Sequence, residues 1–435
     1  MTCAFLCRLH SNSWGGGYWY DSFCLEVDEY LYQNEDFLIL FAAGNNGGDG
    51  YGTLLSPGLS KNALAVAASY STRTINDLPS FSSIGPAPDG RTKPDVTAPG
   101  FSITSAKANP EGNSLETCST TGKAGTSMAT PVTAGTAALI LQYFQDPEFW
   151  KAKCDPSYAL CAKGPFTPKG SLTKALLIHS GVPMENYRGF YPIGTVALTH
   201  TPDIFQGYGR VNLANILTLS GYKDTPFTLF VEQAHLVPFT ELVYKVSVKT
   251  LTKDLRVTLA WFDPPNPEFA ARVLVHDLDI LIVSPTMAQY YGNSFEANKG
   301  ARDELNTVRH SVISHHVTTS LLKVQSHSFN LPYPTLPYPI RTYAHPPHIY
   351  NQNEQVTIGV ENGLVTGLWT VKIQAKALPY VPMQNFSLVI TVDGTVVPPS
   401  AKATPTSISQ QLFEKCPGND IVLVCQAVLC LDCIV

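Results

Sequence analysis

The chain has 435 residues, with 29 Lys and Arg against 34 Asp and Glu and a formal net charge of −5. This balance excludes a basic nucleic-acid-binding surface as the organising feature, and we expect no nucleic-acid partner. Hydrophobic residues make up 44% of the chain and charged residues 14%, which is typical of a globular protein and not of a disordered one. The 31 Gly and 33 Pro favour a β-rich or loop-rich architecture over an all-helical one.

No apolar run approaches the roughly 20 residues that a membrane-spanning helix needs, so we expect no transmembrane segment. The best candidate stretch, Ala137–Phe144, is half that length or less. The first ten residues lack the apolar core of a secretory signal peptide, so this N-terminus does not determine the localisation. The ten cysteines are too few for a disulfide scaffold of this size. Cys154 and Cys161 share one polar loop and are the candidate pair, with two free thiols as the alternative.

Strand-like and helix-like segments alternate through the first half of the chain. Phe37–Ala43, Lys61–Ser69 and Pro94–Ala98 are predicted buried strands, because each is a short apolar run bounded by turn residues. Met128–Phe144 carries apolar residues at helical spacing, and Leu172–Ser180 predicts a second helix. This alternation predicts a parallel α/β sheet covered on both faces.

The period of the apolar pattern changes to two near residue 224. Apolar and polar residues alternate over 242–249 and again over 369–376, which predicts half-buried strands of an antiparallel sandwich. Between them, the proline-rich stretch Ser326–Tyr350 predicts a loop, with a ligand for an aromatic groove as the alternative. The tail from Ser400 contains four cysteines and has no predicted fold.

The most specific motif is GTSMATP at Gly125–Pro131. It places Ser127 where a glycine turn enters a helix. The hydroxyl therefore lies at the positive end of the helix dipole, beside unpaired N–H groups that can bind an oxyanion. This arrangement suits a nucleophile, although a lone serine at such a place often serves only as a helix cap.

A second polar group follows the first buried strand, in the sequence Ala42-Ala43-Gly44-Asn45. Ligand-binding groups gather at the carboxyl ends of strands in open α/β sheets. The amide of Asn45 can donate there to a developing negative charge. A turn that selects Asn and Gly for their backbone conformation is the alternative.

With Ser11-Asn12-Ser13-Trp14-Gly15 upstream, these blocks resemble, in sequence and in order, the subtilisin-like serine proteases (subtilases, peptidase family S8). The α/β-hydrolase alternative fails, because residue 129 is Ala where the G-x-S-x-G turn requires Gly. Segments 56–69, 80–100, 174–181 and 207–217 also resemble the subtilase catalytic domain. Segments between 259 and 394 resemble the jelly-roll domain that follows it in Kp-43-like subtilases.

The resemblance implies three units. Residues 1–224 would be the C-terminal part of a three-layer subtilisin-like α/β catalytic domain, and residues 225–397 an all-β jelly-roll accessory domain. Residues 398–435 would form a cysteine-containing tail. The family also implies protein or peptide substrates, no organic cofactor, and a secreted or endomembrane location.

The resemblance further implies a role for each motif. Ser127 would be the acylated nucleophile and Asn45 the side-chain donor of the oxyanion hole. Ser13, Trp14 and Gly15 would pair with the substrate backbone as an added strand. The small residues Ala42, Ala43 and Gly44 would wall a roomy pocket for the residue before the cut.

The triad partners of Ser127 have no counterpart in these residues. No Asp-x-Gly strand end and no His-Gly-Thr-His helix occurs in the sequence, and neither His10 nor His179 has a matching position. The resemblance therefore implies an N-terminally truncated catalytic domain, with little activity on its own. A non-catalytic peptide-binding homologue is one alternative, and a scaffold that acts through its jelly-roll and proline-rich loop is another.

Two further features concern the second half of the chain. Asp277 and Asp279 alternate along a predicted strand, so their carboxylates share one face and can bind Ca²⁺, with a solvated polar face as the alternative. Asn385 begins the only N-glycosylation sequon, inside a predicted strand.

Overall fold

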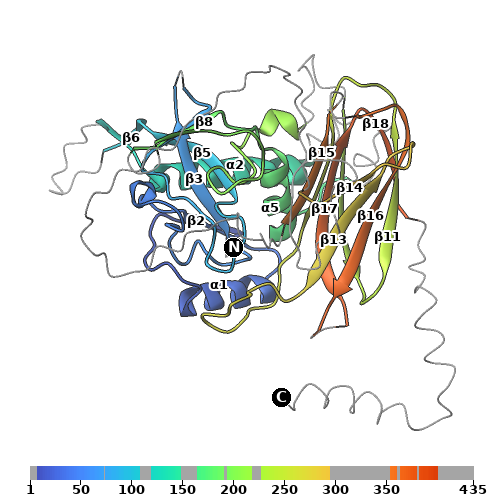
Figure 1. Cartoon of the computed structure of the whole chain (residues 1–435), viewed down its shortest axis with the longest axis horizontal. Helices are drawn as coiled ribbons and strands as arrows, with labels where there is room; N and C mark the ends of the chain where they lie inside the picture. The colour runs from blue at the N-terminus through green and yellow to red at the C-terminus, as the bar shows by residue number, and fades with distance from the viewer. Residues whose placement is uncertain are drawn as a thin grey trace, which may run out of the picture.

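The computed structural model describes residues 7–72, 74–107, 119–147, 164–190, 194–217, 227–293, 353–359, 363–379 and 382–399. Elements before residue 218 form an α/β part and those after residue 226 an all-β part, which lie side by side in Figure 1. Three sequence predictions lie outside the described residues: the Cys154–Cys161 pair, the proline-rich loop and the cysteine-containing tail.

A parallel sheet is the centre of the α/β part, with strand order β1-β2-β3-β5 and every neighbouring pair parallel. All five residues of β2 are buried, which explains its continuous apolar sequence LILFA. The prediction of a parallel α/β sheet is confirmed. The strands are β1 (Leu9–Asn12), β2 (Leu38–Ala42), β3 (Leu64–Tyr70) and β5 (Val96–Phe101).

Both faces of this sheet are covered, as β3 shows. Its alternate residues Leu64 and Val66 lie in one apolar core with residues of α2 and α5, whereas Ala65 lies in a second cluster with Cys24 of α1. Helices therefore cover both faces, as predicted. The two predicted helices are present as α2 (Thr126–Gln145) and α5 (Gly170–His179), which share one core. The other face carries α1 (Ser22–Gln33), which was not predicted.

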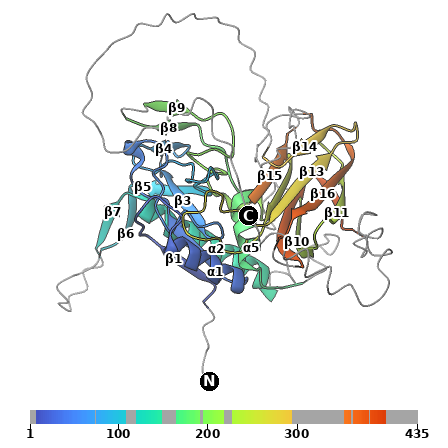
Figure 2. The same ribbon diagram turned by 60° about the horizontal axis from the view of Figure 1, so that its bottom comes forward.

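Smaller elements lie at the periphery of the α/β part, as Figure 2 shows. One three-stranded sheet has the order β4-β8-β9, and a separate hairpin joins β6 to β7. Their bounds are β4 (Asp77–Pro79), β6 (Ile103–Ala106), β7 (Thr120–Lys123), β8 (Asn186–Arg188) and β9 (Thr195–Ala197), with 3-10 turns η1 (Gly47–Asp49) and η2 (Leu213–Asn215).

The all-β part consists of two antiparallel sheets, ordered β10-β17-β12-β15 and β14-β13-β16-β11-β18. They enclose one apolar core that includes Val257 and Ile390 from the first sheet and Ile280 and Trp369 from the second. The predicted antiparallel strands are confirmed, whereas the jelly-roll class and the boundaries at 224 and 397 stay predictions. The strands are β10 (Thr228–Leu236), β11 (Glu241–Val248), β12 (Leu255–Ala260), β13 (Asp277–Val283), β14 (Gln289–Tyr291), β15 (Asn353–Ile358), β16 (Gly367–Ala377), β17 (Gln384–Val392) and β18 (Gly394–Val397).

Helix α5 packs between the two parts, against β2 on one side and β12 and β17 on the other. At its last residue, His179 Nδ1 lies 2.9 Å from Thr258 Oγ1, and Nε2 lies 2.8 Å from Thr391 Oγ1. Burial lowers the pKa of this imidazole well below its ordinary value, so the ring is neutral at physiological pH. His179 is therefore a buried contact between the two parts of the chain.

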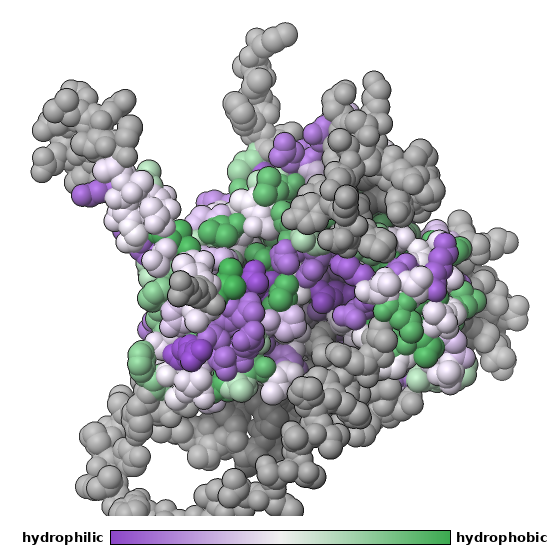
Figure 3. All heavy atoms as spheres, turned by 90° about the horizontal axis from the view of Figure 1, so that it is seen from above, coloured by the Kyte–Doolittle hydropathy of each residue, from purple (hydrophilic) through white to green (hydrophobic). Residues whose placement is uncertain are grey.

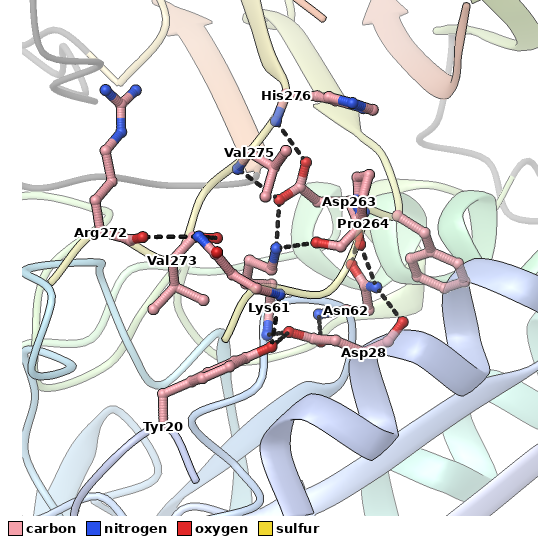
Figure 4. Close-up of polar contacts among 12 residues, drawn as sticks. Tyr20, Asp28, Lys61, Asn62, Asp263, Pro264, Arg272, Val273, Val275 and His276 are labelled. Carbon is pink, nitrogen blue, oxygen red and sulfur yellow. Dashed lines mark hydrogen bonds and ion pairs between the residues drawn. The ribbon is translucent and has the colours of Figure 1, made fainter. Parts of the chain in front are cut away.

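A buried ion pair also joins the two parts (Figure 4). The Nζ atom of Lys61, just before β3, lies 2.5 Å from Asp263 Oδ2, and both side chains have no exposed surface. The same carboxylate accepts the backbone N–H groups of Val275, at 2.9 Å, and His276, at 2.7 Å. Asn62 adds a reciprocal pair, donating to the carbonyl of Asp263 at 2.9 Å and accepting its N–H at 2.8 Å.

The contacts of Lys61 and Asn62 extend into helix α1. Their backbone N–H groups donate to the carboxylate of Asp28, at 3.1 and 2.8 Å, and this carboxylate also accepts the Tyr20 hydroxyl at 2.8 Å. Burial raises the pKa of Asp28, against the opposing effect of the Lys61 ammonium. The backbone carbonyl of Tyr20 in turn accepts the backbone N–H of Phe269 from the all-β part at 2.8 Å.

On the face seen in Figure 3, hydrophilic residues form a band across the centre, with smaller hydrophobic groups beside it. Within the described ranges, no helix combines the length and the hydropathy that crossing a bilayer requires.

The buried Lys61–Asp263 ion pair leads to a testable prediction about the stability of the chain. We expect Asp263→Ala to lower the free energy of unfolding by about 3–5 kcal/mol, because it leaves the Lys61 ammonium buried without its counter-charge. It also removes the acceptor of two backbone N–H groups. The measurement is urea-induced unfolding of the full chain.

The matched control is Asp36→Ala, which removes an exposed partner of Arg8 at 2.7 Å. Surface pairs of this kind contribute less than about 1 kcal/mol. Equal losses in the two variants would contradict a stabilising role for the buried pair.

Candidate active site

The first element of the site is the segment that follows β2. The chain continues from Ala42 through Ala43 and Gly44 to Asn45, whose side chain is exposed. Gly44 has φ +117°, and a Cβ atom there would lie 2.6 Å from Ser83 Oγ and 2.9 Å from Leu55 Cγ. Only glycine fits this turn, so the turn fixes where Asn45 leaves the sheet.

The second element is the start of α2. Gly125 has φ +151° and donates its N–H to the carbonyl of Gly100, beside the end of β5, at 2.9 Å. The helix begins at Thr126, so Ser127 lies in its first turn, and the predicted helix start beside Ser127 is confirmed. Among the described residues, the N–H of Ser127 has no hydrogen-bond acceptor, as expected for the first turn of a helix.

Thr126 connects these two elements. The Oδ1 atom of Asn45 accepts the backbone N–H of Thr126 at 2.9 Å and its hydroxyl at 3.1 Å. The same hydroxyl accepts the N–H of Gly44 at 3.2 Å. Because an N–H group can only donate, the Asn45 atom that faces it is the carbonyl oxygen, and the amide nitrogen must point elsewhere.

The orientation of Asn45 leaves two donors beside the serine. Within the described part of the chain, Asn45 Nδ2 has no acceptor. A Cβ atom built on Gly125 would lie 3.4 Å from Asn45 Nδ2, 3.5 Å from Asn45 Oδ1, which already accepts from Thr126, and 3.6 Å from the backbone nitrogen of Ser127. Both nitrogens therefore border the same small space, which the absence of a side chain at residue 125 keeps open. An oxyanion in that space can accept from both.

The segment after β1 lies against Ser127. The hydroxyl of Ser13 donates to the carbonyl of Ser127 at 2.8 Å, and the hydroxyl of Ser127 donates in return to the carbonyl of Ser13 at 3.4 Å. Trp14 follows with half of its side chain exposed and its ring edge-on to Phe41, with centroids 5.6 Å apart. The structure thus brings the three sequence-predicted blocks together, while their catalytic roles stay predictions.

Ser127 has no general base among the described residues. His10 is an exposed residue of β1 opposite Ile39, and His179 is buried against the all-β part. Neither histidine hydrogen-bonds to Ser127, and no described carboxylate does so. These findings agree with the rejection of both histidines on sequence grounds.

The candidate calcium ligands and the candidate glycosylation site belong to the second half of the chain and do not contact this site. Asp277 and Asp279 are partly buried on one face of β13, as predicted, and Lys376 Nζ lies 3.4 Å from Asp279 Oδ2. No group of three or more His, Cys, Asp or Glu in the described ranges gathers to hold a metal, so calcium stays a prediction. Asn385 of the sequon donates to Glu35 Oε1 at 2.5 Å, a contact that a glycan on this amide would break.

Comparison with known proteins relates the first part of the chain to one family. Residues 4–209 match the subtilase family. Serine protease AprX of Bacillus subtilis (strain 168) is 41% identical over 121 residues, which cover 26% of this chain and 27% of AprX.

Longer but weaker matches extend further along the chain. Serine protease/ABC transporter B family protein tagD of Dictyostelium discoideum is 25% identical over 432 residues, covering 69% of this chain and 23% of tagD. The chain therefore spans about a quarter of that relative. The solved S41 psychrophilic protease is 23% identical over 46% of this chain and 56% of its own, with a TM-score of 0.29.

The role of Thr126 can be tested with an isosteric change. We expect Thr126→Val to lower the free energy of unfolding by about 1–3 kcal/mol, because it leaves the buried N–H of Gly44 without an acceptor. Thr130→Val is the matched control, since that buried hydroxyl only donates, to the Thr126 carbonyl at 2.8 Å. Urea titration of both variants should give the larger loss for Thr126. A larger loss at Thr130 would contradict the connecting role.

Proposed function

We propose that this chain carries the acylation site of a subtilisin-like serine endopeptidase. Ser127 attacks the carbonyl carbon of a peptide bond, the amine leaves with a proton, and water then hydrolyses the acyl-serine ester. The family match and the protease relatives support a serine peptidase. The observation that carries the proposal is the space beside Gly125, which Asn45 Nδ2 and the Ser127 N–H both border.

The two donors act on the charge that forms during attack. The carbonyl oxygen becomes an anion in the tetrahedral intermediate and accepts from both nitrogens, and the positive end of the α2 dipole adds to this stabilisation. Thr126 holds Asn45 in place before the reaction, so little reorganisation is required. Removing one such donor costs about 10²–10³ in kcat in serine proteases.

The segment Ser13-Trp14-Gly15 is proposed to bind the substrate backbone as an added strand. Its contact with Ser127 through the Ser13 hydroxyl brings it beside the attacked carbonyl. The segment Ala42-Ala43-Gly44 is proposed to lie on the other side of the bound peptide. A peptide held between these two segments presents its scissile carbonyl to Ser127.

The proton of Ser127 needs an acceptor. The 435 residues contain no segment like the histidine helix or aspartate strand of the family. The proposal therefore assigns the base and its aspartate to a longer form of this chain or to a second chain. Removal of triad members lowers the rate of subtilisin by about 10⁴–10⁶, and the remaining rate is about 10³–10⁴ above that of the uncatalysed reaction in water. We therefore expect the 435-residue chain alone to be nearly inactive.

The second candidate is a catalytically inactive subtilase homologue that binds peptides. The observation that favours it is that Ser127 Oγ has a backbone carbonyl as its partner, at 3.4 Å, and no base. For either candidate, the all-β part would be a jelly-roll accessory domain. Calcium at Asp277 and Asp279, and a secreted or endomembrane location, are secondary proposals.

A fluorophosphonate probe distinguishes the two candidates. We expect a chain translated from the complete natural transcript to form a covalent adduct on Ser127, because its base activates the hydroxyl. The 435-residue chain should react at least about 10⁴-fold more slowly. Ser127→Ala in the complete chain is the matched control and should not react. The measurement is peptide mapping of the adduct by mass spectrometry.

Two outcomes would overturn the endopeptidase proposal. One is a complete natural chain that carries no histidine and aspartate segments and does not react with the probe. The other is an adduct on a residue other than Ser127. Peptide binding without any adduct would support the inactive homologue.

A further inference from the structure

Ser83 bonds to the turn after β2 on both sides of Asn45. Its backbone N–H donates to the carbonyl of Gly44 at 3.1 Å. Its hydroxyl oxygen accepts the backbone N–H of Asn46 at 3.0 Å. These two groups belong to the two peptide units that flank the Cα atom of Asn45. One residue therefore fixes the backbone from which the Asn45 side chain leaves.

Ser83 and Thr126 act on different parts of Asn45. Thr126 binds the side chain, because its N–H and its hydroxyl donate to Asn45 Oδ1. Ser83 binds only the backbone on either side. Its side chain is completely buried, and a Cβ atom on Gly44 would lie 2.6 Å from its Oγ atom. The hydroxyl thus holds the turn from inside the protein.

The neighbouring residue Ser82 bonds in another direction. Its hydroxyl oxygen accepts the backbone N–H of Ala68, in β3, at 3.1 Å. The carbonyl of Phe81 accepts the N–H of Gly47, further along the turn, at 2.9 Å. The three residues from Phe81 to Ser83 are therefore anchored to the central sheet, and through Ser83 they hold the turn in place.

We propose that Ser83 is a positioning residue for the anion-binding donors of this site, because it holds the Asn45 amide at the space beside Gly125. The inference deepens the proposed function and rests on it. Asn45 would touch the oxyanion, whereas Ser83 acts only through Asn45.

The expected effect follows from the geometry of the turn. Without the Ser83 hydroxyl, the N–H of Asn46 loses this acceptor, and the peptide unit between residues 45 and 46 can rotate. A displacement of about 1 Å can cost about 10²-fold in a site that depends on orientation. A small rotation is therefore enough to move Asn45 Nδ2 away from a bound anion.

The test uses one N-acetyl tetrapeptide with a C-terminal Ala in two forms, the free carboxylate and the carboxamide. Each is titrated into the 435-residue chain by calorimetry. The carboxylate can accept from both donors beside Ser127, so no catalytic base is required. We expect the carboxylate to bind at least about tenfold more tightly than the carboxamide, because a charged acceptor forms the stronger hydrogen bonds. Ser83→Ala should remove most of this preference.

Ser82→Ala is the matched control. Each of the two substitutions removes one buried hydroxyl that accepts one backbone N–H, so both should lower the urea midpoint of unfolding by similar amounts. Only Ser83→Ala should lower the preference for the carboxylate. Asn45→Ala, which removes the donor itself, should lower it as well.

A second variant covers the case in which Ser83→Ala does not fold. Ser83→Cys keeps a similar volume but offers a weaker acceptor, so its preference for the carboxylate should lie between those of wild type and Asn45→Ala. The inference is overturned if wild type does not prefer the carboxylate, or if the folded Ser83 variants retain the full preference. A loss of preference in Ser82→Ala that equals the loss in Ser83→Ala would also overturn it, because both would then act through general destabilisation.

The covalent adduct on Ser127 separates this inference from the proposed function. A carboxylate preference that depends on Ser83, in a complete natural chain whose Ser127 forms no adduct, would support the positioning role and remove the endopeptidase. An adduct on Ser127 that forms equally fast in wild type and in folded Ser83→Ala would support the endopeptidase and overturn the positioning role.

Discussion

The buried contact between Lys61 and Asp263 is the constraint that ties the candidate site to the rest of the molecule. Removing two charges from water costs several kcal/mol per ion, and a single pair in isolation recovers little more than that. Here the carboxylate also accepts two backbone N–H groups, and Asn62 fixes the backbone of Asp263 from both sides. The pair is stable because its hydrogen-bonding capacity is filled.

The same network reaches the segment after β1 in three steps. Asp28 binds the backbone of residues 61 and 62 and the hydroxyl of Tyr20, and Tyr20 follows the part of this segment that contains Gly16 and Tyr18. Asp21, the cap of α1, accepts the hydroxyl of Ser56 at 2.6 Å, and the backbone of Ser56 bonds to Gly16 and Gly17. The segment after β1 and the all-β part therefore share buried contacts. Loss of the all-β part would expose the polar groups of this network.

Sequence patterns predicted the elements whose burial follows a simple period. The run LILFA is buried throughout, and the alternation in β11 and β16 matches their half-buried faces. Helix α1 was missed because its buried face includes the carboxylate of Asp28, which a hydrophobic pattern counts as exposed. Strand β1 was missed because only Asn12 of its four residues is buried. The peripheral strands have three or four residues, too few to show a period.

The residues of the candidate site likewise divide into those that the sequence could identify and those that it could not. Ser127 and Asn45 could be found because each lies in a local motif with a distinctive sequence. Thr126 could not be assigned its connecting role from the sequence, because that role depends on contacts between distant residues. The Thr126–Asn45 bond spans 81 positions and the Lys61–Asp263 pair spans 202. No local pattern encodes such a contact.

Under the proposed function, binding and proton transfer are separable because different groups would perform them. The proposed oxyanion donors are a backbone N–H and an amide, and neither changes its charge between pH 5 and 8. Their positions depend on Gly125 and Thr126, and neither position requires a histidine. The described residues therefore hold the two donors in place without a base hydrogen-bonded to Ser127. Peptide binding by this site can thus be measured independently of acylation.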